Sequence, residues 1–344
     1  MVFKSLVKKI LLYLFSTMGY LELLRWKNRN KICVLMLHGV MAPNDKTYWE
    51  PLRPQLSPDE LTRTLTILSE LYTFITAKQA IDILEGKSPS IKHAMLITLD
   101  DGYRNNIDYA LPIFEKYGIK PVLFVVTGNI DSGLPFMVDR LDYALQQNMG
   151  GILSIPYAGE SYQFDARSRE ALQESYKVFR DYCKSKFVND IKMSEVFNAI
   201  AETLENQSGC SLEDIYKDDD WSVVASWGML RKVVQENRLD VGSHTVDHWR
   251  LDCLEQLDLL YQLKESKKRI EKELLIKCNY FCYPNGNYNN LAIEKIVDSG
   301  YRAAFSTDVG LCAVGDDVNT LQRFNFPANK TKHELLYLLN RRAL

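Results

Sequence analysis

Two adjacent carboxylates, Asp100 and Asp101, follow directly on the apolar run Ala94–Leu99 and precede a glycine. Neighbouring acids in a partly dry site repel each other unless a cation or hydrogen bonds offset their charge. In α/β proteins the carboxyl ends of strands are where reacting groups gather. An Asp-Asp-Gly sequence by itself is more typical of a solvated turn, so its meaning depends on what other strand ends carry.

Two of the five histidines, His244 and His248, lie four residues apart just after the apolar run Leu239–Val241. On a helical turn this spacing puts both imidazoles on one face, where they can bind the same metal ion. Two neutral imidazoles, one carboxylate and an open position for water describe a catalytic zinc site rather than a closed structural one. Together with the Asp-Asp pair, the two histidines predict a catalytic metal site.

Two further strand ends carry residues that could face the same site. The run Tyr280–Tyr283 continues into Pro284, Asn285 and a glycine, a turn whose backbone N–H groups could point into the same opening. The first apolar run, Ile32–Leu37, is followed by His38 and a glycine. Taken alone, these features indicate only a turn and a structural histidine.

Residues so far apart in the sequence need a scaffold that brings strand ends together, and the chain shows a matching rhythm. Short β-rich apolar runs are followed by helical patterns, which is typical of βα units and a largely parallel sheet. The 344 residues fit one α/β barrel with insertions, so we predict a distorted (β/α)7-type barrel. The apolar runs are Ile32–Leu37, Ala94–Leu99, Val122–Val126, Leu239–Val241, Tyr280–Tyr283, Ala303–Phe305 and Leu321–Phe326. The helical patterns are Asp59–Leu71, Arg104–Tyr117 and Cys253–Leu274.

About a hundred residues between Gly128 and Trp227 break this rhythm. They contain the helical patterns Ala171–Lys186 and Met193–Asn206 and few strand signals. We interpret residues 129–226 as a mainly helical insertion that shapes access of the substrate. The predicted organisation is an N-terminal amphipathic segment over residues 1–30 and a barrel over residues 31–344 that contains the insertion. The acidic run Asp218–Asp220 is interpreted as a solvated turn or helix cap.

Composition excludes some classes of function. A net charge of −2 and a sequence pI near 6.3 give no global basic field that would draw the protein to nucleic acid. The seven cysteines are scattered and include no Cys-x-x-Cys pair. They indicate buried or half-buried thiols rather than a disulfide framework, which favours a reducing compartment.

The N-terminus has features of a membrane-binding segment. Lysines precede the apolar run Ile10–Phe15, as at the start of a signal peptide, but the run is too short to span a bilayer and no Ala-x-Ala-like cleavage site follows. Three interpretations stay open: a helix packed on the barrel, an amphipathic helix in the membrane plane, and an export signal. We expect a cytoplasmic protein, peripheral at the inner membrane in the second case. The apolar residues at helical spacing are Leu6, Ile10, Leu14, Met18 and Leu21.

Together the three motifs resemble the polysaccharide deacetylase family, the NodB-homology or carbohydrate esterase family 4 group. The Asp-Asp sequence looks like the first family motif, which implies that Asp100 is the general base and Asp101 a metal ligand. The sequence Ser243–His248 is similar to the second motif, which implies that its two histidines complete the ligand set. The Tyr-Pro-Asn-Gly sequence matches the third motif in part, and Trp227–Leu230 is similar to a tryptophan-led helix of many members. The resemblance covers residues 32 to about 326 outside the insertion.

The chain departs from the family pattern at two places. The third motif usually begins with an arginine that orients the base, but this chain has Cys282 there. Arg323 is the candidate replacement, with a surface arginine as the alternative. The family's C-terminal Leu-x-His motif, the source of its general acid, is absent, and His333 lies at a predicted helix start. His38 resembles a histidine of the poly-N-acetylglucosamine deacetylase-like branch that serves as the acid; the alternative is a structural histidine.

The resemblance implies metal-assisted removal of an N-acetyl group from an amino sugar in a surface polysaccharide or its precursor. Asp101, His244 and His248 would hold Zn²⁺ or another divalent ion such as Ni²⁺, Co²⁺ or Mn²⁺, and groups at residues 283–285 would stabilise the oxyanion. The expected partner is an N-acetylated amino sugar, as polymer, oligomer or lipid-linked unit. Two alternatives stay open: removal of a formyl or other acyl group from a lipid-linked amino sugar, and a catalytically silent carbohydrate-binding relative.

Overall fold

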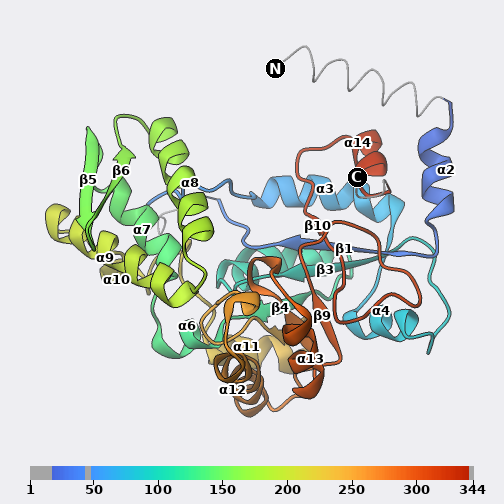
Figure 1. Ribbon diagram of the computed structural model, residues 1–344. Coiled ribbons are helices and arrows are strands. Elements are labelled where there is room, and N and C mark those ends of the chain that lie inside the picture. Colours follow the sequence, from blue (N-terminus) through green and yellow to red (C-terminus); the bar gives the residue numbers. More distant parts are fainter. Residues whose placement is uncertain (1–17, 43–47, 341–344) are drawn as a thin grey trace.

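In the computed structural model, which describes residues 18–42 and 48–340, parallel strands form one curled sheet with helices packed around it (Figure 1). The order along the sheet is β10-β1-β3-β4-β7-β8-β9, and the short β2 pairs with β3. The strands are β1 (Ile32–Leu37), β2 (Thr73–Phe74), β3 (Ala94–Leu99), β4 (Val122–Val125), β7 (Asp240–Ser243), β8 (Tyr280–Cys282), β9 (Ala303–Phe305) and β10 (Phe324–Asn325).

The segment that follows β9 contacts strands at both ends of this sheet, first β9 and then β1. Phe324 of β10 lies opposite Leu35 of β1, while Leu321, just before β10, forms a parallel bridge with Phe305 of β9. The predicted run Leu321–Phe326 therefore changes pairing partner midway, which is why little of it is regular strand. The prediction of a distorted α/β barrel is confirmed.

Alternate strand residues face two different cores, as expected for a curled parallel sheet. Val34, Leu96 and Phe124 belong to an interior cluster that also includes residues of α4 (Ala77–Leu84). Leu35 and Ile97, one position along, pack in the larger cluster beneath the outer helices. The strands are therefore packed on both faces, and this packing fixes the positions at which the residues after each strand begin.

The outer helices follow most of the strands. The N-cap of α3 is Ser57, whose hydroxyl accepts the Glu60 N–H in a capping box, and this helix matches the predicted one within a residue. These helices are α3 (Pro58–Leu71), the π-helical turn η1 (Asn106–Ala110), α5 (Leu111–Lys116), α11 (Trp227–Gln235), the 3-10 turn η2 (Leu251–Cys253), α12 (Gln256–Leu274), α13 (Asn290–Asp298) and α14 (Lys332–Leu338).

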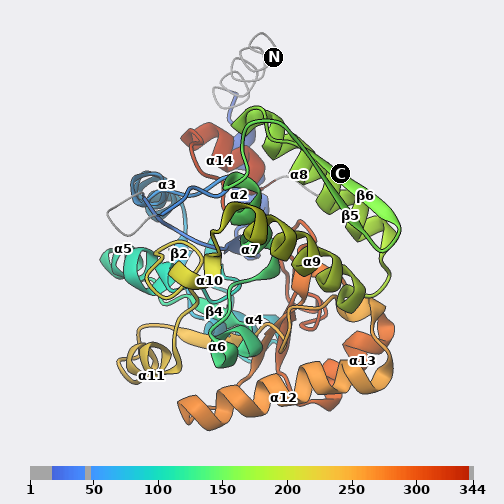
Figure 2. The same ribbon diagram turned by 90° about the vertical axis from the view of Figure 1, so that its left-hand side faces the viewer.

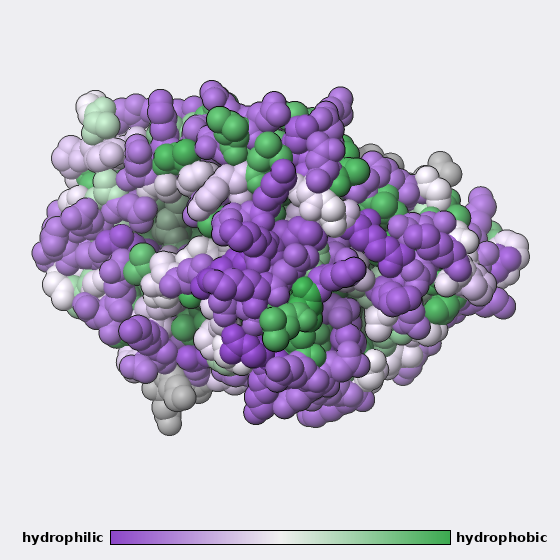
Figure 3. Space-filling model, turned by 90° about the horizontal axis from the view of Figure 1, so that it is seen from below, coloured by the Kyte–Doolittle hydropathy of each residue, from purple (hydrophilic) through white to green (hydrophobic). Residues whose placement is uncertain are grey.

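The face of the molecule that includes α12 (Gln256–Leu274) is mostly hydrophilic, with hydrophobic residues in small groups (Figure 3).

The chain between β4 and β7 stands largely to one side of the barrel (Figures 1 and 2). Its members pack around a separate hydrophobic cluster that includes Leu141, Phe164, Phe179 and Phe197. The elements are α6 (Thr127–Ser132), α7 (Met137–Gln146), β5 (Ile152–Tyr157), β6 (Glu160–Asp165), α8 (Arg169–Lys186), α9 (Asp190–Ser208) and α10 (Leu212–Ile215). The antiparallel pair β5–β6 is an addition to the mainly helical segment that the sequence predicts.

The acidic run Asp218–Asp220 differs from its sequence interpretation. Asp219 is fully buried and accepts hydrogen bonds from the Ser222 N–H, at 2.7 Å, and the Ser222 hydroxyl, at 2.6 Å. Asp220 forms a 2.6 Å ion pair with Arg104. The expectation of a solvated turn is therefore wrong for these two residues, which tie the segment before β7 to the barrel.

The described part of the N-terminal segment is the helix α2 (Tyr20–Lys27). Leu21 is fully buried in the main core, which also contains residues of α14. Leu23 and Trp26 face solvent, with 56% and 58% of their surface exposed. The predicted apolar run Ile10–Phe15 lies outside the described residues. Within the described ranges, no helix combines the length and apolar character needed to span a bilayer.

Candidate active site

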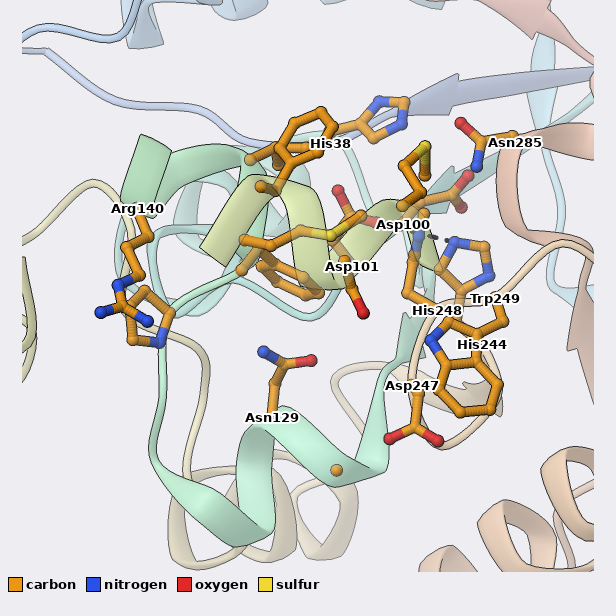
Figure 4. Close-up of a pocket in the computed structure, with 18 of the residues that line it drawn as sticks. His38, Asp100, Asp101, Asn129, Arg140, His244, Asp247, His248, Trp249 and Asn285 are labelled. Atoms are coloured by element: carbon orange, nitrogen blue, oxygen red, sulfur yellow. Dashed lines mark ion pairs between the residues drawn. The ribbon is translucent and has the colours of Figure 1, made fainter. Parts of the chain in front are cut away.

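Strand ends bring together the residues that the three sequence motifs supply (Figure 4). His38 follows β1, the Asp100–Asp101 pair follows β3, and His244 and His248 follow β7. All five line one cavity of about 580 Å³. Because the strands are parallel, their carboxyl ends open on the same side, and groups separated by two hundred residues become neighbours.

Three of these side chains form a compact group of metal-ligand type. Asp101 Oδ1 lies 3.6 Å from His244 Nε2 and 3.4 Å from His248 Nε2. Among the described residues, this oxygen is buried and has no hydrogen-bond partner. A buried carboxylate oxygen without a hydrogen-bond partner is unfavourable unless a cation compensates its charge. Two imidazole nitrogens and a carboxylate suit Zn²⁺ or a similar divalent ion, so the residues present fit a metal.

The buried member of the histidine pair is oriented for this task. The His244 Nδ1–H donates to the Cys282 carbonyl oxygen over 2.8 Å, which leaves the Nε2 lone pair facing Asp101. Burial, and next the proximity of His248, lowers the pKa of His244 to about 4. The imidazole is therefore neutral near pH 7, as a metal ligand must be.

The two histidines do not lie on a helical turn, contrary to the expectation from their spacing. They bracket a tight loop in which Thr245 and His248 have φ angles of 72° and 60°. The His248 N–H donates to Thr245 Oγ1 at 2.8 Å, and Gln262 Oε1 accepts the N–H groups of Val246 and Asp247. Left-handed angles are uncommon for residues other than glycine, and in this loop they accompany a geometry in which both rings face Asp101.

Asp100 is held by Arg323, which is fully buried rather than a surface arginine. Two parallel N–H···O contacts of 2.8 Å join the guanidinium to the two carboxylate oxygens. The guanidinium also donates to the Ser306 carbonyl, and Cys282 Sγ lies 3.0 Å from it and 3.5 Å from Asp100 Oδ2. Burial raises the pKa of Asp100, but the charge and hydrogen bonds of Arg323, together with the charges of His244 and His38, outweigh burial, and the net shift is downward.

The turn after β8 provides fewer hydrogen-bond donors for an oxyanion than the sequence predicts. The Tyr283 N–H donates to the Phe305 carbonyl over 3.0 Å within the sheet, so it is not available to an oxyanion. Pro284 has no N–H. Asn285, with a φ angle of 55°, lines the cavity, and its side-chain oxygen accepts a 3.0 Å hydrogen bond from Lys184 Nζ. Of the three residues, Asn285 remains the candidate oxyanion donor.

His38 lies at the rim of the group. Its side chain is exposed and lines the cavity, and its carbonyl accepts a 2.8 Å hydrogen bond from Asn106 Nδ2. Burial raises the pKa of Asp101, but the close approach of His248 and the charges of His38 and the other histidines shift it well below its ordinary value. His333, the other histidine considered for the acid, is at the start of α14 and is not among the residues that line this cavity.

The insertion contributes residues that no sequence motif indicated. The ring of Phe136 lies edge-on to His248, with 6.0 Å between ring centres. Arg140, Arg180 and Lys184 line the same cavity from α7 and α8. Arg180 and Lys184 are four residues apart in a predicted helix, but that spacing alone says only that they share a helical face.

Comparisons with known proteins agree on one family. A family model described as polysaccharide deacetylase matches residues 87–151 and 186–304. The protein YxkH of Bacillus subtilis strain 168, whose description also names polysaccharide deacetylase, is 40% identical over 60 residues. That match covers 17% of this chain and 21% of YxkH.

Solved structures share the fold at low sequence identity. The deacetylase PplD of Streptococcus pyogenes, solved in complex with acetate, is 16% identical with a TM-score of 0.58, and the match covers 90% of this chain and 99% of that one. IcaB of Ammonifex degensii is 16% identical with a TM-score of 0.57, covering 91% and 98%. A de-N-acetylase of Aggregatibacter actinomycetemcomitans is 16% identical with a TM-score of 0.53, covering 89% and 99%.

Proposed function

This chain belongs to the polysaccharide deacetylase family, and we propose that it hydrolyses the N-acetyl group of an amino sugar in a surface polysaccharide or its precursor. The observation that carries this proposal is the metal-ligand group of Asp101, His244 and His248, directly beside the arginine-held Asp100 in one cavity. The acetate in the PplD structure is the product that such a reaction releases, which supports the choice of acyl group.

Asp101, His244 and His248 would hold the divalent ion. When bound there, Zn²⁺ or a similar ion supplies polarisation of the acetamide carbonyl and a lowered pKa for a bound water. His244 contributes a fixed Nε2 lone pair, and Asp101 contributes the buried oxygen that has no other partner among the described residues.

Asp100 is the proposed general base. Arg323 keeps its carboxylate ionised and fixes its orientation, so that it can accept a proton from the attacking water. Attack of that water on the acetamide carbon breaks the C–N bond once the nitrogen has been protonated. His38 is the proposed donor of this proton, and the products are acetate and the free amino sugar.

The test is acetate release from a panel of N-acetylated glucosamine oligomers, with metal analysis of the same samples. We expect about one divalent ion per chain and acetate production that stops on chelation. Asp100→Asn should retain the ion and lose turnover by about 10²–10⁴-fold, because it removes only a proton acceptor. His244→Ala should lose the ion itself. Full metal occupancy in His244→Ala, or near-normal turnover in Asp100→Asn, would contradict these assignments.

We further propose that the protein works at a membrane surface, where the substrate is a lipid-linked or nascent chain. The support is α2, which presents Leu23 and Trp26 to solvent beside Lys27 and Arg29. A lipid-linked amino sugar would also make removal of a formyl group a reasonable second activity. Comparing acetyl and formyl derivatives of one sugar tests the second activity: because a formyl amide is intrinsically more reactive, a kcat/KM for the acetyl derivative that equals or exceeds that for the formyl derivative would contradict it.

A further inference from the structure

The cavity of the active site is lined by more cationic side chains than its metal-ligand group requires. Four of them come from outside the family motifs: Arg53, Arg140, Arg180 and Lys184. Arg53 forms an ion pair with Asp139, and Arg140 is 2.7 Å from Glu205. The charges of the first two are therefore balanced within the protein.

Arg180 and Lys184 form no such close ion pair among the described residues, although the more distant carboxylates Asp181 and Asp190 act on Lys184. Within the described ranges, no carboxylate lies within 4.0 Å of the Arg180 guanidinium or the Lys184 ammonium group. Both side chains are half-buried and lie one helical turn apart on α8. Burial, and next the charges of Arg180 and Arg250, lowers the pKa of Lys184. Holding two like charges together at the wall of a cavity is unfavourable unless an anion joins them.

Contacts place these cations next to the reacting groups. Lys184 Nζ donates to Asn285 Oδ1 over 3.0 Å, and Asn285 lies beside His38 and Asp100 at the strand ends (Figure 4). The Arg180 guanidinium lies over the Tyr176 ring, 5.6 Å from its centre, and a contact through the ring face does not use the N–H groups of the guanidinium. Both cations also fall in the stretch 152–185 that the family model does not match. The family match therefore does not account for them.

We propose that the substrate carries an anionic group, a phosphate or a carboxylate on or next to the sugar that is deacetylated, and that Arg180 and Lys184 bind it. Guanidinium groups pair with both kinds of oxyanion through two parallel hydrogen bonds, and an ammonium group adds a second charge. This inference deepens the proposed function and rests on it for the position of the acetamide.

The test compares three substrates: N-acetylglucosamine 1-phosphate, N-acetylglucosaminuronic acid and the neutral methyl glycoside of N-acetylglucosamine. The variants are Arg180→Gln, the charge-conserving Arg180→Lys, and Lys177→Gln as a control on the exposed side of α8. We expect Arg180→Gln to lower the ratio of kcat/KM for an anionic substrate to that for the neutral one by about tenfold, mainly through KM. Arg180→Lys should keep most of the ratio, and Lys177→Gln all of it. The anion that gives the higher wild-type ratio identifies the group as phosphate or carboxylate.

A ratio that stays within twofold in Arg180→Gln overturns the inference and leaves the proposed function intact. A protein that releases acetate neither from the three substrates nor from the oligomer panel contradicts the proposed function instead. In that case binding decides the inference: calorimetry with the two anionic sugars, on protein carrying Asp100→Asn, should show about tenfold weaker binding when Arg180→Gln is added. Equal affinities with and without Arg180→Gln, or no binding of either sugar at millimolar concentration, overturn it independently of hydrolysis.

Discussion

Asp100 and Arg323 form a buried ion pair that the sequence leaves open. The sequence predicts a base at residue 100 from its motif, and it names Arg323 as a candidate only because the usual arginine position is occupied by Cys282. No periodicity distinguishes a surface arginine from a buried one on a strand that pairs irregularly. In the structure Leu321 pairs with β9 and Phe324 pairs with β1, and Arg323 lies buried at this change of partner.

The metal-ligand group was more predictable. Type and spacing predict a metal site from His244, His248 and one carboxylate, and the family resemblance implies that the carboxylate is Asp101; the structure brings these ligand atoms together. The loop conformation was not predictable, because the left-handed φ angle of Thr245 is imposed by contacts of its neighbours with Gln262 on α12. Local propensity for this conformation is low in threonine, so tertiary contacts decide it.

His38 is the proposed proton donor, and its replacement is the sharpest test at the scale of single residues. If His38 is the acid, His38→Ala should lower amide turnover by about 10²–10⁴-fold, because an amine must be protonated before the C–N bond breaks. Metal content and the KM for the substrate should change little. The loss should be much smaller on an activated aryl acetate ester, whose leaving group departs without a proton. Turnover of amide and ester are the two measurements, and equal losses would indicate a structural histidine.

At the scale of elements, strongly patterned segments were predictable. Helix α3 has its capping residues in the sequence, and α8 and α9 extend the predicted helices by only two or three residues at an end. The hairpin β5–β6 was missed because its inward side relies on only a few apolar residues, such as Tyr162 and Phe164, set among exposed polar ones. Its turn uses left-handed angles at Ala158 and Gly159, and alanine gives no turn signal.

The loop after β4 closely approaches the loop between His244 and His248. The Gly128 N–H donates to the Val246 carbonyl over 2.8 Å, and a Cβ at Gly128 would lie 2.6 Å from that oxygen. Gly128→Ala must therefore displace the loop that carries His248. We expect metal affinity to fall about tenfold and the free energy of unfolding to fall by about 1–3 kcal/mol.

Competition with a chromophoric chelator and urea unfolding are the two measurements for this change. Gly151→Ala is the matched control, because a Cβ there meets no atom within 4 Å and the backbone is not left-handed. Metal affinity in Gly128→Ala equal to that of the control would show that the two loops move independently.

A buried carboxyl in the insertion predicts a pH dependence of stability. Asp142 on α7 accepts the Leu52 N–H at 2.9 Å, and burial raises its pKa from 3.8 to about 7. Between these values the folded protein binds the proton and the unfolded chain does not, so this carboxyl stabilises the fold at low pH and the contribution is lost as pH rises through about 7. The full effect is on the order of 4 kcal/mol.

Urea unfolding at pH 5, 6, 7 and 8 measures this contribution. Asp142→Asn, which is neutral throughout, should flatten the decline in the free energy of unfolding relative to wild type. Asp165→Asn is the control, because the hydrogen bonds from Arg167 lower the pKa of Asp165 to about 2, below the tested range. A wild-type decline that survives in Asp142→Asn would assign it to other groups.

At the scale of the whole molecule, the fold separates three tasks. The barrel holds the reacting groups, the insertion adds cations and aromatic surface to one wall of the cavity, and α2 with α14 covers a different part of the barrel (Figures 1 and 2). Family membership accounts for the first task, since the matched residues include Asp100, Asp101, His244 and His248. The insertion and α2 lie partly or wholly outside the match, so the match itself identifies neither the sugar nor the compartment.

The last prediction concerns localisation through α2. Leu23 and Trp26 are more than half exposed, and Lys27 and Arg29 stand beside them. Burial of one such apolar side chain in a lipid interface contributes about 1.5–3 kcal/mol, and each cation near an anionic surface about 1 kcal/mol. Replacing Leu23 and Trp26 by serine should therefore weaken sedimentation with phosphatidylglycerol vesicles by about tenfold or more, with turnover of soluble oligomers unchanged. Leu257→Ser on α12 is the control, because it removes a side chain that is 81% exposed on another face. Equal vesicle binding by all three proteins would mean that α2 does not contact the membrane.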